Sequence, residues 1–420
     1  MLTYITLENF KSIQNQEIKL AKINLFIGPN RAGKSTISQA IALLKQSEHM
    51  IKWDGNILHL KDFQNTLCKK HTIPKISIQF GGFFSQYKLS KLIGTSRTAY
   101  GIQVGIDSDG LSEIGYKLEG GPLKISNTIS RKSTPGIPRI EINGVRFEFR
   151  QGLQFNRFLQ TAGYSKIEPQ SEIDDYLIGR AVDEFTETID KQLSFCRFIP
   201  TTRGFDKSIY PLLDGITEIP SSLGVTKQSE TAVSNMAYDH KIKDRITSLI
   251  QRVIPDSNID VRNIPPHQVQ VVNKDRFGEY PITDEGFGLN QLIYLFQQLV
   301  MGENGSTYFI DEPEIALHPA SQFDLCSALL HISQTEDKQL IMTTHSEHML
   351  LGFLELIMMK KLSSTDLKVY SFEKPEGITK ITELKANENG ELEGEPKGFF
   401  AVDMAHIDRF IQSIKDKNDS

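Results

Sequence analysis

A short segment near the start of the chain has the spacing of a phosphate-binding loop. Gly28 and Gly33 bracket four residues and are followed by Lys34 and Ser35, within the stretch GPNRAGKST. Glycines let a loop turn so that its backbone N–H groups converge on an anion. The lysine then reaches the outer phosphates of a nucleotide, and the serine hydroxyl ligates Mg²⁺. The expected nucleotide contacts are Gly28, Pro29, Asn30, Arg31, Ala32, Gly33, Lys34, Ser35 and Thr36.

The residues on either side of this loop have the strand–loop–helix order that such a site requires. Residues 23–27 (INLFI) are nearly all apolar, which is typical of a central strand buried on both faces. Residues 35–47 have helical spacing, so a helix is expected to begin near Ser35. The positive end of that helix would add to the attraction for phosphate.

Two acidic residues and a histidine far along the chain supply complementary groups. Asp311 and Glu312 follow the apolar run YFI, which places them at the tip of a strand. Asp311 there suits Mg²⁺, and Glu312 is positioned to polarise an attacking water as a general base. His345 closes another apolar strand, LIMTTHS, where it would face the ligand crevice of a parallel sheet. His348 lies three residues on, but no third ligand is evident, so we do not expect a metal pair.

The order of these motifs predicts how the chain is divided. About 280 residues separate the phosphate loop from the acidic pair, yet both must reach one Mg-nucleotide. We therefore expect residues 1–75 and 271–420 to form one α/β domain, with residues 76–270 as an insertion projecting from it. Alternating stretches at 76–155 indicate a β-rich lobe, and helical spacing at 170–196 and 228–254 indicates a helical arm region. Sustained heptads are absent, which excludes a long coiled coil.

Composition favours a globular protein of the cytoplasm. The chain has 420 residues, of which 39% are hydrophobic, and contains no run of about 18 apolar residues that would span a membrane. The start does not have the pattern of a signal peptide. The three cysteines, Cys68, Cys196 and Cys326, are too few and too far apart for a disulfide or zinc framework, so reduced thiols are expected.

Charge is distributed unevenly along the chain. The net charge is −5, but residues 1–80 contain 11 basic and 5 acidic side chains, whereas residues 270–420 contain 13 basic and 25 acidic ones. Overall acidity argues against a protein that simply coats nucleic acid. A local basic face remains open.

Four stretches in this order carry a resemblance to a known family: GPNRAGKS, DEGFGLNQ, FIDEPEIALHP and TTHSEH. The chain resembles the ABC-type ATPases of the RecF, SMC and OLD (overcoming lysogenization defect) kind. It is similar in particular to the OLD-like "AAA" ATPases, in which a GfGxxQ turn, an [ED]EPExxLHP stretch and a THS stretch recur. The resemblance covers roughly residues 1–50 and 280–400. It implies an α/β fold with an ABC-type P-loop ATPase head, ATP and Mg²⁺ as cofactors, and ATP hydrolysis.

The resemblance also implies roles for individual residues. Glu312 would be the catalytic glutamate and His345 the switch histidine, while Ser35 and Asp311 would hold the metal. Residues 314–319 would form the D-loop, which crosses a dimer interface in this family. Lys11 would touch the nucleotide, and Gln64 and Gln79 remain two candidates for the Q-loop glutamine. The residues that would replace the ABC signature and cap ATP held by a second subunit are Gly286, Gly288, Asn290 and Gln291.

The sequence departs from the family in three respects. GFGLNQ lacks the serine-glycine-glycine signature of transporters and SMC proteins, and the SMC coiled coils are missing. Only about 75 residues follow His345, too few for the nuclease (TOPRIM) domain of full OLD proteins as well as the last ATPase strands. Asp107 and Asp109, in IDSDG, are best interpreted as a solvated turn. Intrinsic nuclease activity is therefore not expected.

These features favour an ATP-gated dimerisation switch with slow turnover. Two copies would close on two Mg-ATP molecules as a homodimer or a higher homo-oligomer. The partner would be a separately encoded nuclease effector, with this chain as the sensor of a bacterial anti-phage system. The alternative is a DNA-binding repair ATPase like RecF. A transporter ATPase is disfavoured by EPExxLHP and by the signature-like turn.

Overall fold

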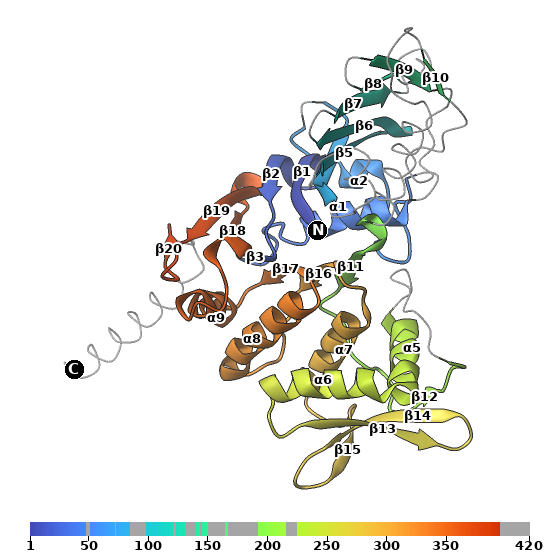
Figure 1. The fold of residues 1–420 in the computed structure, drawn as a ribbon, viewed down its shortest axis with the longest axis vertical. Helices are drawn as coiled ribbons and strands as arrows, with labels where there is room; N and C mark the ends of the chain where they lie inside the picture. Colours follow the sequence, from blue (N-terminus) through green and yellow to red (C-terminus); the bar gives the residue numbers. More distant parts are fainter. Residues whose placement is uncertain are drawn as a thin grey trace, which may run out of the picture.

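A computed structural model describes residues 1–47, 51–71, 73–84, 98–120, 123–130, 139–142, 145–149, 164–166, 192–215 and 225–394. Within these ranges, a mixed sheet of seven strands separates two hydrophobic cores (Figure 1). One core lies toward a second, antiparallel sheet, and the other lies toward a layer of helices. The sequence also predicts a charged helix from about residue 403, and this segment lies outside the described residues.

The seven-stranded main sheet brings the predicted motifs to one edge. Its strand order is β11 (Cys196–Ile199), β16 (Thr307–Asp311), β17 (Gln339–Thr344), β3 (Ile23–Ile27), β18 (Leu367–Glu373), β19 (Lys380–Ala386) and β20 (Leu392–Glu393). The first five are parallel, and β19 and β20 continue antiparallel. Because parallel strands share a direction, the carboxyl ends of β3, β16 and β17 meet. The phosphate loop, the acidic pair and His345 follow these three ends.

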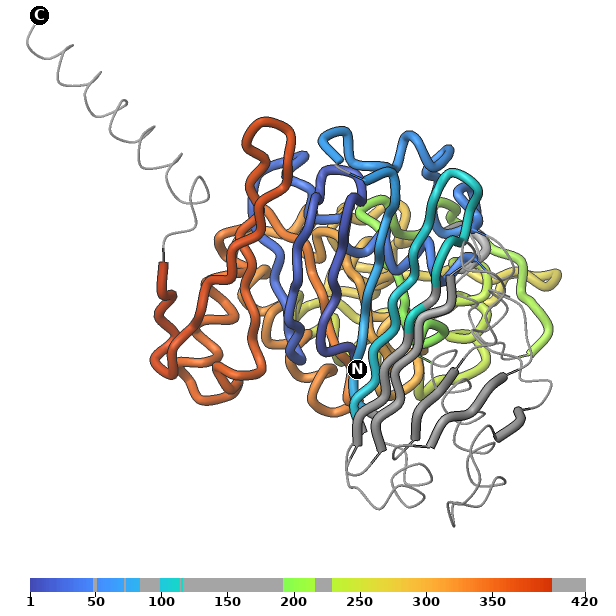
Figure 2. Tube along the Cα trace, turned by 90° about the horizontal axis from the view of Figure 1, so that it is seen from above, coloured from blue at the N-terminus to red at the C-terminus, as the bar shows by residue number. Residues whose placement is uncertain are grey.

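The second sheet is antiparallel and lies over the main one, with its strands side by side in Figure 2. Its order is β2 (Ile13–Lys19), β1 (Leu2–Phe10), β4 (Ile76–Phe84), β5 (Thr98–Asp107), β6 (Gly110–Gly120) and β7 (Leu123–Ser130). A three-stranded sheet follows, formed by β8 (Arg139–Ile142), β9 (Val145–Phe149) and β10 (Tyr164–Lys166). Asp107 and Asp109 lie at the turn between β5 and β6, where the Asp109 N–H donates to Asp107 Oδ1 at 3.0 Å.

The central segment of the chain contributes strands to both sheets. β4 pairs with β1, and β11 pairs in parallel with β16. Strand pairing therefore joins residues 76–270 to the antiparallel sheet through β4 and to the main sheet through β11. β11 falls at the boundary between the expected helical stretch at 170–196 and residues 198–220, whose prolines predict a loop. Four residues are too short to show a period, and this strand forms because it covers the edge of β16.

Helices cover both faces of the main sheet. On the side of the antiparallel sheet lies α1 (Thr36–Gln46), and on the opposite side lie α6 (His240–Val253), α7 (Phe287–Met301), α8 (Pro319–Thr335) and α9 (Glu347–Met358) (Figure 1). The remaining elements are α2 (Phe63–Thr66), α5 (Val225–Tyr238), β12 (Tyr210–Pro211), β13 (Asn258–Ile264), β14 (Gln268–Lys274), β15 (Glu279–Pro281), η2 (Ser364–Asp366) and η3 (Pro375–Gly377).

The lengths of these helices limit what they can do. The longest helix in the described part of the chain is α8, with 17 residues, so no long coiled coil occurs there. In the same part of the chain, no helix has both the length and the apolar character needed to cross a membrane.

The alternation of side chains in β3 shows how the two cores form. All five residues of β3 are buried. Ile23, Leu25 and Ile27 face the core beneath the helices, whereas Phe26 faces the core beneath the antiparallel sheet. There the Phe26 ring packs against Phe372, with ring centroids 5.1 Å apart. Full burial of each such side chain stabilises the fold by about 1.5–3 kcal/mol. Because β3 is packed on both faces, its end and the loop that follows it have a fixed position.

Candidate functional site

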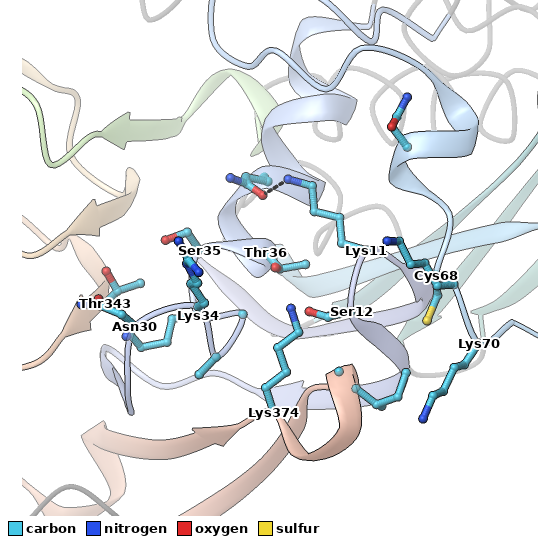
Figure 3. Close-up of a pocket in the computed structure, with 18 of the residues that line it drawn as sticks. Lys11, Ser12, Asn30, Lys34, Ser35, Thr36, Cys68, Lys70, Thr343 and Lys374 are labelled. Atoms are coloured by element: carbon cyan, nitrogen blue, oxygen red, sulfur yellow. Dashed lines mark hydrogen bonds between the residues drawn. The ribbon is translucent and has the colours of Figure 1, made fainter.

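A pocket of about 750 Å³ opens at the carboxyl edge of the main sheet (Figure 3). Its walls come from the phosphate loop, the turn at Lys11 and Ser12, the segment from Gln64 to Lys70, and η3 with the residues beside it. Thr201, Glu312, Thr343 and His345 line it as well. Segments far apart in the sequence therefore share one cavity, as the order of the motifs predicted.

The glycines of the phosphate loop occupy positions that exclude a side chain. Gly28 has φ +140° and Gly33 has φ +101°, a range that residues with a Cβ rarely adopt. A Cβ on Gly28 would lie 2.3 Å from the Phe372 carbonyl oxygen, and one on Gly33 would lie 2.4 Å from Thr379 Oγ1. Both glycines therefore lie in close contact with the segment from β18 to β19, which packs against the phosphate loop.

Lys34 is held at the base of the pocket by three acceptors. Its ammonium donates to Gly28 O at 2.8 Å, to Pro29 O at 3.1 Å and to His345 Nε2 at 2.9 Å. Burial lowers the pKa of Lys34 to about 8. Burial and the charge of Lys34 lower the pKa of His345, so the neutral imidazole accepts this hydrogen bond at neutral pH. The three acceptors of Lys34 are uncharged groups. A bound triphosphate would place negative charge next to the Lys34 ammonium.

Three oxygen-bearing side chains converge next to Lys34. Asp311 Oδ1 accepts from Ser35 Oγ at 3.1 Å and from Thr343 Oγ1 at 2.9 Å. Desolvation raises the pKa of the buried Asp311 carboxyl, and the nearby charge of Glu312 raises it further. A hard divalent cation prefers such oxygen ligands and would offset that cost. The residues present therefore fit Mg²⁺, which Ser35 and Asp311 would hold.

Glu312 lines the pocket in an unusual backbone conformation. Its φ is +49°, in the left-handed region, which costs about 1–2 kcal/mol for a residue with a side chain. Its N–H donates to Thr343 O at 3.0 Å, and its carboxylate Oε1 lies 3.4 Å from His345 Nε2. Strained backbone of this kind persists where the surroundings hold it. In this conformation Glu312 lines the same pocket as Lys34 and Ser35.

The other predicted residues fall into two groups. Lys11 lines the pocket and donates to Gln39 Oε1 at 2.5 Å, and burial lowers its pKa. Gln64 also borders the pocket, whereas Gln79 pairs with Gln103 between β4 and β5. Gly286, Gly288, Asn290 and Gln291 are not among the pocket-lining residues of their own chain. They form the first turn of α7 and the residue that precedes it.

Sequence reasoning did not find several residues of this site. Thr343 lies inside the TTHS stretch, so its neighbour His345 was a usable signal. Thr201 follows β11, a strand that was not expected. Lys374 follows β18 and carries no local motif, yet Figure 3 shows it reaching from the start of η3 toward the phosphate loop. Arg203, buried beside the acidic pair, also lay in a segment interpreted as a loop.

Comparison with known proteins identifies the class to which this site belongs. A family model for AAA ATPase domains matches residues 1–92 and 181–350, which is more than half of the chain. The chain therefore belongs to this family of ATPase domains. No curated protein matches the sequence.

Solved structures show the same fold at low sequence identity. An SMC head bound to the C-terminal winged-helix domain of ScpA is 13% identical, with a TM-score of 0.52, 91% of this chain covered and 98% of the other. SMC heads from Thermotoga maritima (12% identity, TM-score 0.45, 91% and 99% covered) and Pyrococcus furiosus, the latter bound to the C-terminal domain of ScpA (12%, 0.49, 91% and 96%), also match. The expected α/β fold of an ABC-type ATPase head is confirmed.

Proposed function

We propose that this ATPase is a switch in which two copies close on Mg-ATP and reopen after hydrolysis. The proposal depends on the separate positions of the pocket and of the first turn of α7. The pocket holds Lys34, Glu312 and His345, whereas the first turn of α7 lies outside it and is exposed at Gly286 and Phe287. A helix N-terminus attracts anions. In the closed pair, each ATP would contact the phosphate loop of one copy and this helix end of the other.

Within each pocket the residues have distinct roles. Backbone N–H groups within residues 30–36, together with Lys34 and Lys11, bind the phosphates. Ser35 and Asp311 hold Mg²⁺, which neutralises phosphate charge when bound. Glu312 accepts a proton from the attacking water. His345 contacts the γ-phosphate, and its hydrogen bond with Lys34 holds its ring beside the phosphate loop. Hydrolysis breaks the bond between the β- and γ-phosphates, and once inorganic phosphate leaves, the charge that both copies contact is reduced, so the pair separates.

The surface offered to the second copy combines α7 and the D-loop. Gly288 lies against this loop so closely that a Cβ would be 2.5 Å from Ala316 O. Phe287, at the start of α7, is 58% exposed, and Ala316, His318 and Pro319 of the D-loop are exposed as well. The exposed Gly286 would thus approach the partner's nucleotide, whereas Gly288 and Gln291 are buried and, with Asn290, support this helix end from within their own chain.

The dimer should depend on Phe287 but not on a comparable aromatic elsewhere. We expect wild-type protein to double its mass in the presence of Mg²⁺ and a non-hydrolysable ATP analogue, measured by light scattering on a sizing column. Phe287→Glu places a negative charge where two copies and a triphosphate meet, so it should remain single while binding the analogue normally. Phe277→Glu is the matched control, because Phe277 is 74% exposed on the β14–β15 hairpin. It should dimerise like wild type.

Two results would contradict the proposed dimer. If the wild type stays single at saturating analogue and forms no higher assembly, the switch is wrong. If Phe287→Glu dimerises as well as Phe277→Glu, the two copies do not meet at α7.

Lys374 should strengthen ATP binding, because it brings an additional positive charge to the pocket. In the described residues its ammonium makes no hydrogen bond or ion pair, and Figure 3 shows it directed toward the phosphate loop. A charge-assisted contact to phosphate is worth about 1.5 kcal/mol, equivalent to roughly tenfold in affinity. We expect Lys374→Ala to weaken ATP about tenfold in a fluorescence titration.

The matched control for Lys374 is Lys380→Ala. Lys380 is an exposed lysine at the start of β19 and does not line the pocket. Its replacement should leave ATP affinity unchanged. Equal effects of the two substitutions would show that Lys374 acts only through the net charge of the protein.

The biological setting that we propose is a bacterial anti-phage or DNA-maintenance system in the cytoplasm, with a separately encoded nuclease as effector. The EPExxLHP and THS stretches, shared with OLD-like ATPases, support this setting. The SMC heads that share the fold are described as bound to ScpA domains, which supports a separate partner here. A RecF-like DNA-binding ATPase is the alternative, favoured by the basic excess of residues 1–80. DNA binding that strengthens with ATP and weakens with salt would favour that alternative.

A further inference from the structure

A buried arginine holds the backbone on both sides of Glu312. Arg203 is only 5% exposed and lies in the loop after β11. Its Nη1 donates to Pro200 O at 3.0 Å and to Asp311 O at 2.8 Å. Its Nη2 donates to Glu312 O at 2.8 Å and to Pro313 O at 3.2 Å. The carbonyls of Asp311 and Glu312 flank the Glu312 Cα, so one guanidinium fixes the two peptide planes that set the direction of the Glu312 side chain.

This arrangement requires an arginine. Burial lowers the pKa of Arg203 to about 10, so the group is still charged at neutral pH. Its planar fork reaches four carbonyl oxygens with fixed geometry, whereas a lysine ammonium is a single point with at most three donors. Glu312 needs such support because its φ of +49° is unfavourable by itself.

The other end of the same loop is clamped to the first turn of α7. Asn290 Oδ1 accepts from the Phe205 N–H at 2.7 Å, and Asn290 Nδ2 donates to Phe205 O at 3.0 Å. Gln291 Nε2 donates to the backbone oxygen of Arg203. Between them Gly204 has φ +109°, and a Cβ there would lie 2.9 Å from Asn290 Oδ1. The two amide side chains therefore bind the loop of their own chain, and the helix end moves with it.

We propose that Arg203 is a positioning residue for Glu312 and that, through Asn290 and Gln291, it couples the exposed end of α7 to hydrolysis. A second copy that presses on Phe287 displaces the first turn of α7. The amides of Asn290 and Gln291 transmit this displacement to residues 203–205, and the guanidinium transmits it to the peptides around Glu312. The positioning part rests only on ATP hydrolysis by Glu312. The coupling part rests on the proposed dimer.

The test separates positioning from a merely structural role. Arg203→Lys keeps the charge but loses the fork, so ATP affinity should stay within about threefold while kcat falls about 10-fold to 100-fold. In a Glu312→Gln background, Arg203→Lys should change the residual rate little, because the group it positions is already gone. Lys338→Met is the matched control: Lys338 is fully buried and donates to Leu299 O and Glu336, away from the pocket. It should lower the melting temperature without selectively lowering kcat.

Asn290→Asp tests the hydrogen bonds between Asn290 and Phe205, and it replaces Arg203→Lys as the test variant if Arg203→Lys does not fold. It keeps the acceptor for the Phe205 N–H and removes the donor to Phe205 O, so kcat should fall while ATP affinity is retained. Positioning is overturned if folded Arg203→Lys hydrolyses ATP like wild type, or if its loss of rate is equally large with Glu312 and with Gln at position 312. If the wild type never dimerises but Arg203→Lys still loses kcat selectively, coupling fails and positioning stands.

Discussion

Replacing Glu312 by glutamine should lower kcat for ATP hydrolysis by about 100-fold or more, the usual effect of removing a general base. The amide keeps the size of the side chain but cannot accept the proton from water. ATP affinity should not change, because Glu312 is expected to act on the attacking water and not on the phosphates. Phosphate release in single-turnover experiments, together with an ATP titration, measures the two quantities separately. In the proposed switch hydrolysis opens the pair, so the variant should also accumulate as a dimer with ordinary ATP.

Glu376→Gln is the matched control for this experiment. Glu376 also lines the pocket, but it lies at the rim beside Lys70, with its carboxylate oxygen 3.3 Å from Lys70 Nζ. Its neutralisation should change kcat less than about twofold, as expected for an exposed ion pair. If Glu312→Gln hydrolyses ATP at the wild-type rate, the base has been wrongly identified, and Asp311 becomes the carboxylate to test next.

The pocket residues of the phosphate loop and of the acidic pair could be predicted from the sequence, because each follows a strongly apolar strand pattern. Gly28 to Thr36 follow a strand with five buried residues, and Asp311 and Glu312 end another. Since parallel strands align their carboxyl ends, these patterns alone place Lys34, Asp311 and His345 together. The contacts of Lys34 with His345 and of Ser35 with Asp311 agree with that reasoning.

The residues that escaped prediction depend on contacts between distant segments. Arg203 bonds to carbonyls more than 100 residues away, and no spacing rule relates a buried arginine to them. β11 is four residues long and exists because β16 offers it an edge. Lys374 reaches the pocket only because β18 lies next to β3. Such features follow from tertiary pairing, which a single sequence does not encode locally.

Lys34→Ala should weaken ATP binding by about 100-fold or more, because a buried cation next to the phosphates is lost. The loss should not arise from unfolding. Burial lowers the pKa of Lys34 to about 8 from the value of 10.5 expected in the unfolded chain, so the folded state disfavours the charged form. Below about pH 8 that penalty is fully present. Removing Lys34 should therefore leave the melting temperature at neutral pH unchanged or raise it.

The same pKa predicts how ATP affinity depends on pH. A bound triphosphate stabilises the ammonium and raises the pKa of Lys34 above the value of about 8 that it has in the empty pocket. Below that pH both states are protonated, so affinity is constant. Above it the empty protein must take up a proton to bind ATP, and affinity should fall by up to about tenfold per pH unit. Titrations between about pH 7 and pH 10 measure this slope. The residual binding of Lys34→Ala should lack it, and a slope that persists there would place the titrating group elsewhere in the pocket, with Lys11 the first candidate.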